Sequence, residues 1–181
     1  DDVTWDDFSL AYNRLKGENI DGLVLDVRDN PGGSLDVVLD IADNFLDEGT
    51  IVTTKDKNDN EIVEKSDADY DIPMVLIQNE NSASASEILA GALKDRKRAK
   101  IVGTQSFGKG IVQKIFDLEN GTGAKITISE YFTPSGNKIH KIGVTPDIEV
   151  EADEDFDISK KDLKNDKQFI YALTELLDEL K

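Results

Sequence analysis

Three short apolar runs, separated by segments with helical spacing, most constrain how this chain can fold. Each run is too short for a buried helix and is typical of a buried strand; they are GLVLDV (22–27), MVLIQ (74–78) and KIVGT (100–104). Apolar residues recur at helical spacing over residues 35–46 and 86–95 between them. Because parallel strands need a crossover connection, this order predicts a parallel sheet covered by helices, in a mixed α/β fold.

The segments around this centre add helices and antiparallel strands. Thr4 as N-cap, with Asp7 three positions later, predicts a helix that stops at Gly17. Gly49 is expected to end the helix over 35–46. Alternating runs predict a hairpin of residues 51–55 and 61–65 and two further strands over 110–116 and 125–132. We expect a core over residues 1–150, followed over 151–181 by an acidic linker and an amphipathic C-terminal helix packed on that core.

Composition excludes several classes of protein. The 181 residues include 38 acidic and 21 basic side chains, and the net charge of −17 is a poor match for nucleic acid or anionic lipid. The absence of cysteine rules out disulfides and thiolate chemistry. No apolar run approaches the ~20 residues that a membrane helix needs, so we expect no direct membrane insertion. The sequence starts without Met or a signal peptide, and we expect its targeting segment to lie outside these residues.

Two motifs resemble ligand sites but fail in detail. DKNDNE (56–61) begins like a calcium loop, yet its sixth residue is Glu61 where the turn requires glycine. GTQSFGKG (103–110) has the spacing of a phosphate-binding loop, but Gly110 replaces the hydroxyl residue that would hold magnesium. The segment that follows it alternates like a strand and offers no helix N-terminus to a phosphate. We therefore expect no metal and no cofactor.

The segment NENSASASEILAG (79–91) places three serines where a buried strand gives way to a helix. Ser84 and Glu87 have capping-box spacing, so Ser84 can be an N-cap, with Ser82 and Ser86 as small filler. The same corner would place a serine beside backbone N–H groups and the positive end of a helix, which suits a nucleophile whose attack creates an oxyanion. The residues alone leave both interpretations open.

A serine nucleophile needs a base. His140, on a predicted strand, is the only histidine. A neutral lysine can replace histidine, and a close-packed, mostly apolar pocket favours the neutral form. Lys109 in FGKGI (107–111) fits such a pocket better than the lysines of KDRKRAK (94–100).

Several segments, in this order, resemble the C-terminal processing peptidases, also called tail-specific proteases. The matching segments are LVLDVRDNPGG (23–33), NSASASEILAGAL (81–93), GKGIVQ (108–113), YFTPSGNKI (131–139) and GVTPDIEV (143–150). The resemblance runs from about residue 20 to 150. It implies a fold similar to the crotonases and the Clp-type peptidases, a spiral of mixed β and α.

The resemblance also implies roles for individual residues. Ser84 matches the family's nucleophile, and Lys109 matches its general base at the usual separation. The other positions carried over are Gln113, which supports the lysine, Asp95, implicated in one branch of the family, and the oxyanion-hole residues Gly32, Gly33 and Ala85. The chemistry implied is a Ser-Lys dyad that forms an acyl-enzyme.

The function implied is a serine endopeptidase that cleaves proteins at or near their C-termini, with protein or peptide substrates that have accessible C-termini. The family works outside the cytoplasm, on the periplasmic or cell-envelope side, and we expect a membrane tether through an N-terminal segment. Its members carry a PDZ domain ahead of the core; no stretch here has that length or pattern, so we expect substrate capture and gating to lie outside this sequence. A homo-oligomer stays open. Two alternatives also stay open: a catalytically silent binding domain in which Ser84 only caps a helix, and a crotonase-type acyl-CoA enzyme.

Overall fold

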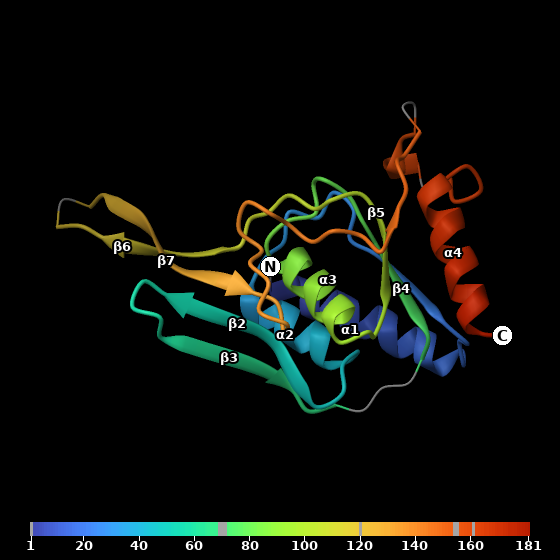
Figure 1. Cartoon of the computed structure of the whole chain (residues 1–181), viewed down its shortest axis with the longest axis horizontal. Coiled ribbons are helices and arrows are strands. Elements are labelled where there is room, and N and C mark those ends of the chain that lie inside the picture. Colours follow the sequence, from blue (N-terminus) through green and yellow to red (C-terminus); the bar gives the residue numbers. More distant parts are fainter. Residues whose placement is uncertain (1, 69–71, 120, 154–155, 161) are drawn as a thin grey trace.

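Two four-stranded sheets, one parallel and one antiparallel, organise the chain (Figure 1). The computed structural model describes residues 2–68, 72–119, 121–153, 156–160 and 162–181. Its elements are, in chain order, α1 (Asp2–Gly17), β1 (Leu23–Asp26), α2 (Leu35–Asp43), β2 (Gly49–Asp56), β3 (Glu61–Ser66), β4 (Met74–Gln78), α3 (Ala85–Asp95), β5 (Lys100–Gly103), β6 (Ile111–Asp117), β7 (Gly123–Phe132), β8 (Ile148–Glu149), a 3₁₀ turn (Ile158–Lys160) and α4 (Lys167–Glu179). The sheets have the orders β1-β4-β5-β8 and β3-β2-β7-β6.

The parallel sheet is buried on both faces, which explains why its strands are continuous apolar runs. Every residue of β4 is buried. Met74 and Leu76 face the larger core, which α1, α2 and α3 help to form, whereas Val75 and Ile77 face a smaller core under α4. Because successive side chains of a strand point to opposite faces, β4 serves two cores at once.

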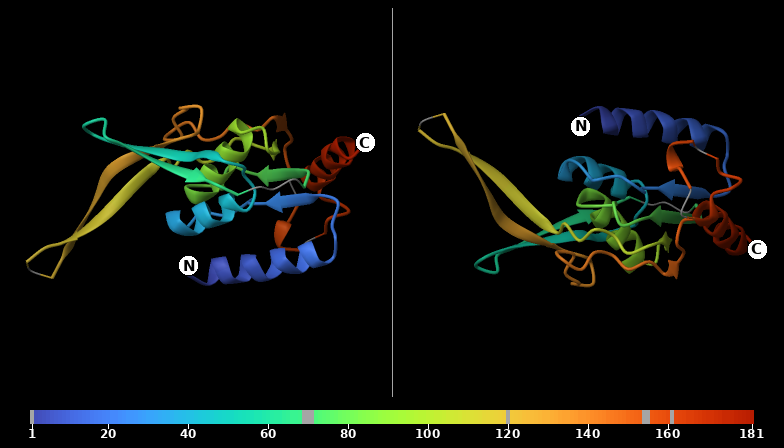
Figure 2. Two further views of the ribbon diagram at one scale, coloured as in Figure 1. Left: turned by 90° about the horizontal axis from the view of Figure 1, so that it is seen from below. Right: turned by 90° about the horizontal axis from the view of Figure 1, so that it is seen from above.

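The antiparallel sheet carries a long arm. β6 and β7 pair as a hairpin that extends away from the rest of the molecule in all views (Figures 1 and 2). The base of β7 pairs with β2, which joins the arm to the body. Apolar side chains such as Ile115 and Ile126 are exposed along the hairpin, at 66% and 50% of their surface.

The mixed α/β fold, the parallel sheet and the 51–65 hairpin are confirmed, but several boundaries are not. α1 begins at Asp2, so Thr4 lies within the helix and is not its N-cap. α2 ends at Asp43 and is capped by Asn44, whereas Gly49 starts β2. Phe45 and Leu46 extended the helical pattern because both side chains are fully buried, not because they are helical.

Three further points concern the second half of the chain. The short strand β8, which pairs in parallel with β5, was not predicted. His140 lies in a turn, not on a strand. The expected acidic linker over 151–157 falls partly outside the described residues, and the division of the chain at residue 150 stays a prediction. None of the helices in the described ranges has the length and apolarity to cross a membrane.

Candidate active site

The turns that follow β1 and β4 meet at one edge of the parallel sheet. The two strands pair in parallel, with Asp26 opposite Ile77, so their carboxyl ends lie side by side. Asn30 in the first turn accepts hydrogen bonds on its carbonyl from the Ala83 N–H, at 3.0 Å, and from Ser86 Oγ, at 3.1 Å. The turn over residues 27–33 is therefore fastened to the serine segment.

Ser82 and Ser86 are more than small filler, and that expectation is wrong. Ser82 Oγ donates to the Val27 carbonyl at 2.8 Å, and Ser86 Oγ donates to the Asn30 carbonyl. Both hydroxyls are buried and bridge segments more than fifty residues apart in the sequence. The alternation of serines thus gives two cross-links with Ser84 between them.

Ser84 stands directly before α3 in a strained backbone conformation. Its φ of 56° and ψ of −114° fall where a residue with a side chain is rarely found, and such strain is characteristic of functional corners. Its N–H donates to Glu87 Oε2 at 2.8 Å, which is one half of the predicted capping box. Its side chain is only partly buried, so the predicted N-cap is also an accessible hydroxyl.

Glu87 connects the Ser84 corner to the lysine loop. Its side chain is fully buried, yet both oxygens are satisfied. Oε1 accepts from Ser106 Oγ and from the Gly108 N–H, each at 2.6 Å. Oε2 accepts from the Ser84 N–H and from the Lys109 N–H, each at 2.8 Å. Sequence reasoning assigned Glu87 only a capping role; the nearby glycine-lysine-glycine loop gave no signal that its amides would share this carboxylate.

Lys109 is brought to Ser84 through its backbone, while its side chain is exposed. The loop is close-packed, as expected, because a Cβ on Gly110 would collide with the backbone of residues 139–140. The expected apolar pocket for the lysine is wrong in this structure: the neighbouring Phe107 side chain is 65% exposed. The loop lies at the surface with its amides turned inward to Glu87, and its longer side chains face outward.

The three predicted oxyanion-hole residues differ in what their amides do. The Gly32 N–H donates to Asn30 Oδ1 at 2.9 Å and is already used. A Cβ on Gly32 would lie 2.5 Å from the Ala83 carbonyl, so this glycine permits close approach of the two turns. The N–H groups of Gly33 and Ala85 have no acceptor within the described part of the chain. The two turns that approach each other at Gly32 and Ser84 therefore each carry one free N–H donor.

A mostly apolar cavity of ≈ 240 Å³ adjoins these donors. Gly33 and Ala85 lie on its rim, and its wall includes Leu25, Val38 and Leu89. The cavity thus combines an apolar wall with the two residues whose amides are free.

The two remaining predicted residues are not gathered around Ser84. Asp95 is at the far end of α3, about 16 Å away along the helix axis at 1.5 Å per residue. Its carboxylate accepts from the N–H and the hydroxyl of Ser135 and holds the turn after β7. Gln113 is exposed on β6, where its amide donates to Thr127 Oγ1 at 3.4 Å.

Charge at the site is arranged around the turn after β1. Hydrogen bonds from the side chains of Asn81 and Asn79 lower the pKa of Asp29 below its ordinary value.

In the residues that the structure describes, no cluster of three or more His, Cys, Asp or Glu side chains could hold a metal ion. Asp56, in the loop that resembles a calcium site, accepts instead from the backbone of Asn58 and Asn60.

Comparison with known proteins identifies the family. A family model described as peptidase family S41 matches residues 1–150. The chain belongs to peptidase family S41. This match includes every residue singled out above for catalysis, from the β1 turn to the lysine loop.

Relatives within this peptidase family are processing proteases. The chain is 44% identical over 143 residues to a carboxyl-terminal-processing protease of Synechocystis, a match that covers 78% of this chain and 34% of the relative. It is 38% identical over 171 residues to the carboxy-terminal processing protease CtpB of Bacillus subtilis, covering 89% of this chain and 34% of the relative. The chain thus spans about a third of the length of these relatives.

Solved structures show the same fold. A photosystem II D1 C-terminal processing protease superposes with a TM-score of 0.79 at 38% identity, over 83% of this chain and 40% of that protein. The tricorn protease shares the fold alone, with a TM-score of 0.58 at 22% identity over 88% of this chain and 15% of its own.

Proposed function

We propose that this chain is the core of a serine endopeptidase that cleaves proteins at or near their C-termini through a Ser84–Lys109 dyad. The observation that carries the proposal is the shared Glu87 carboxylate, whose Oε2 accepts from the N–H groups of both Ser84 and Lys109. One buried anion thereby places the candidate nucleophile and base beside each other, next to the free amides of Gly33 and Ala85.

The reaction would proceed through an acyl-enzyme. Ser84 Oγ attacks the scissile carbonyl carbon and gives its proton to the neutral Lys109 amine. The N–H groups of Gly33 and Ala85 stabilise the oxyanion that forms. The C–N bond then breaks, the leaving amine takes the proton from Lys109, and a water molecule releases the acyl group from Ser84 by the same steps.

Because the Lys109 side chain is exposed, we propose that the bound substrate shields it from water. An ammonium group in water keeps its proton, whereas a group shielded from water by bound polypeptide loses the hydration that favours its charge. A peptide lying across Ser84 and the apolar cavity would cover this loop. Gln113, four residues further along β6, is within the strand that such a peptide would adjoin, and we assign it a supporting role for Lys109. Asp95, at the other end of α3, is assigned to the turn around Ser135.

The names of the matched relatives support a proposal for the substrates and the location of this protein. The names of the matched proteases support protein substrates processed at their carboxyl termini. Two relatives are described as chloroplastic and one solved structure as a lipoprotein of Streptococcus agalactiae. For this chain we propose a place outside the cytoplasm, on the periplasmic or envelope side, with a tether to a membrane.

A fluorophosphonate probe tests the nucleophile directly. The adduct should map to Ser84 by peptide mass spectrometry and disappear in Ser84→Ala. Ser82→Ala, which removes a neighbouring buried hydroxyl but not the proposed nucleophile, should still label at Ser84. An adduct on Ser82 or Ser86 would overturn the assignment.

A binding domain that retains the fold is the second candidate, and the exposed side chain of Lys109 favours it. In that case the strained Ser84 corner serves only to cap α3. Absence of both labelling and turnover of a peptide with a free C-terminus, at any pH from neutral to alkaline, would establish the binding role.

A further inference from the structure

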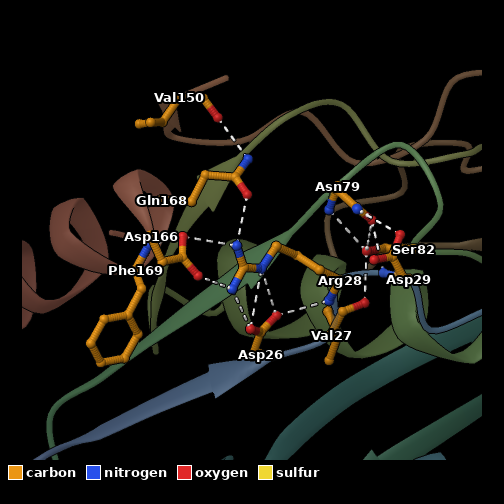
Figure 3. Close-up of polar contacts among 10 residues, drawn as sticks. All are labelled: Asp26, Val27, Arg28, Asp29, Asn79, Ser82, Val150, Asp166, Gln168 and Phe169. Carbon is orange, nitrogen blue, oxygen red and sulfur yellow. Dashed lines mark hydrogen bonds and ion pairs between the residues drawn. The ribbon is translucent and has the colours of Figure 1, made fainter. Parts of the chain in front are cut away.

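Arg28, directly after β1, is a buried cation whose guanidinium is fully paired. Only 8% of the residue is exposed. Its Nε and Nη2 atoms donate to Asp26, and Nη1 and Nη2 donate to Asp166 at 3.0 and 2.6 Å. Nη1 also donates to Gln168 Oε1 at 3.0 Å (Figure 3). No other basic side chain in the described residues is buried in this way.

Two of the three partners come from the C-terminal helix. Asp166 is the N-cap of α4 and accepts from the Phe169 N–H, and Gln168 lies in its first turn and donates to the Val150 carbonyl. Both are almost fully buried, at 1% and 2% exposure. They lie beyond residue 150, where the match to the family model ends.

The backbone of Arg28 belongs to the turn that reaches the candidate active site. Its neighbour Val27 accepts from Ser82 Oγ on one side of the turn (Figure 3). Asn30, two residues after Arg28, is bonded to Ala83 and Ser86, and it also holds the Gly32 N–H. Gly33, with one of the two free amides, follows at once. A shift of Arg28 would therefore move the oxyanion turn relative to Ser84.

Electrostatics make Asp166 the partner on which the position of Arg28 depends. Burial opposes the charge of Arg28, but the hydrogen bonds to Asp26 and Asp166 outweigh it and raise its pKa above the ordinary value. The Asp26 side chain is 36% exposed, whereas that of Asp166 is 2% exposed. Removing one partner of a buried pair leaves an uncompensated charge that draws the group toward water.

We propose that Asp166 and Gln168 are positioning residues of the peptidase, which act through Arg28 to hold the 27–33 turn and its Gly33 amide in place. α4 is then part of the catalytic apparatus although none of its residues touches the substrate. The catalytic consequence rests on the proposed function, whereas the mechanical link between α4 and the turn does not.

The first test uses Asp166→Asn. Asparagine still caps a helix as well as aspartate does, but it carries no charge and turns an N–H group toward Arg28. We expect kcat on a peptide substrate to fall about 10- to 100-fold, as a small misplacement of reacting groups can do. KM should change less than kcat, because the apolar cavity wall that includes Val38 and Leu89 belongs to α2 and α3 and not to the turn. Gln168→Met, which removes an acceptor from Arg28 without changing charge, should give a smaller loss of the same kind.

Glu175→Gln is the matched control. Glu175 also lies on α4 and ties it to the body by an ion pair with Lys100 at 2.6 Å, but it makes no contact with Arg28. Its loss should leave kcat within about twofold, since partly exposed ion pairs contribute little. A second control is the double variant: in an Arg28→Met background, Asp166→Asn should have no further effect on kcat.

Hydrogen exchange separates this inference from the proposed function. Amides of residues 27–33 should exchange faster in Asp166→Asn than in the wild type or in Glu175→Gln, while amides of β4 keep their protection. If the wild type neither reacts with the fluorophosphonate probe nor cleaves peptide, the proposed function fails. The exchange rates alone then decide whether α4 holds the 27–33 turn through Arg28. The inference is overturned if the amides of residues 27–33 exchange no faster in Asp166→Asn and Gln168→Met than in Glu175→Gln. It is also overturned if Asp166→Asn lowers kcat as much in the Arg28→Met background as it does in the wild type.

Discussion

Among the residues that the structure describes, the buried Glu87 carboxylate has no cationic partner, and its four donors are three backbone amides and one hydroxyl. A carboxylate so placed accepts and never donates. It therefore selects one arrangement of the Ser84 corner and the 106–109 loop, because any other arrangement would leave a buried acceptor unpaired.

Glu87→Gln should disconnect this arrangement. One oxygen becomes an NH₂ group that faces at least one backbone N–H donor, so we expect the free energy of unfolding to fall by about 1–3 kcal/mol. The rate of fluorophosphonate labelling should fall well beyond what the lost stability explains. Urea unfolding and labelling at a temperature where the variant is folded would measure both. Glu80→Gln, which affects one hydrogen bond from Thr104, is the control; equal effects of the two variants would contradict the role of Glu87.

Lys109→Arg distinguishes a base from a positive charge. Arginine keeps the charge but cannot lose a proton in a protein, so it should be nearly as damaging to kcat as Lys109→Ala. Lys114→Arg, at a lysine on β6, should have little effect. Peptide turnover from neutral to alkaline pH is the measurement. Substantial activity in Lys109→Arg would remove the dyad and leave Ser84 as a helix cap.

Residue types at the site were predictable, whereas their contacts were not. The spacing of Ser84 and Glu87 indicated a helix N-cap at the point where a buried strand gives way to a helix. The hydroxyls of Ser82 and Ser86 looked like filler because their acceptors lie more than fifty positions away. The exposure of Lys109 depends on how its loop sits on the surface, which local sequence does not encode.

Elements were predicted best where burial is continuous. β4 coincides with its apolar run because the strand is buried along its whole length. The predicted stop of α1 at Gly17 is confirmed, whereas the start of α1 and the end of α2 were misplaced because caps and packing residues give the same local signal. β8 has two residues, Ile148 and Glu149, and exists through its pairing with β5. A strand of that length has no pattern of its own to detect.

The end of β5 offers a test at this scale. Gly103 has a φ of 122°, and a Cβ there would collide with the Gln78 carbonyl of β4. Gly103→Ala should lower the free energy of unfolding by at least about 2 kcal/mol, from strain and overlap together. Gly123→Ala, where the nearest atom to the new Cβ lies 3.4 Å away, should cost under about 1 kcal/mol. Chemical denaturation compares them; equal stability of the two variants would show that β5 can move away from β4.

At the scale of the whole molecule, charge opposes compactness. The net charge of −17 implies mutual repulsion across the surface. Raising sodium chloride from about 0.02 to 0.2 M shortens the Debye length below about 10 Å and should raise the unfolding midpoint by about 2–4 °C at pH 7. The gain should shrink at pH 5, closer to the isoelectric point of ≈ 4.3. Calorimetry at both pH values is the check, and a midpoint that falls with salt at pH 7 would contradict it.

The overall architecture could be predicted from the sequence, whereas the contacts of α4 could not. Three apolar runs required a sheet with two covered faces, and the helical segments between them supplied one cover. The amphipathic pattern over 169–180 predicted a helix packed on the core. It could not say that Asp166 and Gln168 would meet Arg28, because that contact depends on the three-dimensional path of the last thirty residues.

The parallel pairing of β1 with β4 also has a consequence for how activity arises in time. Ser84 and the Ala85 amide come from one segment, the Gly33 amide comes from a segment about fifty residues earlier, and the lysine loop follows only after β5. Contacts between distant segments form late, since a long loop must close before they can hold. A nascent or partly folded chain therefore carries the serine without the site. On the proposed function, a chain at this stage would cleave neither itself nor its neighbours, and covalent labelling of Ser84 would report the last step of folding.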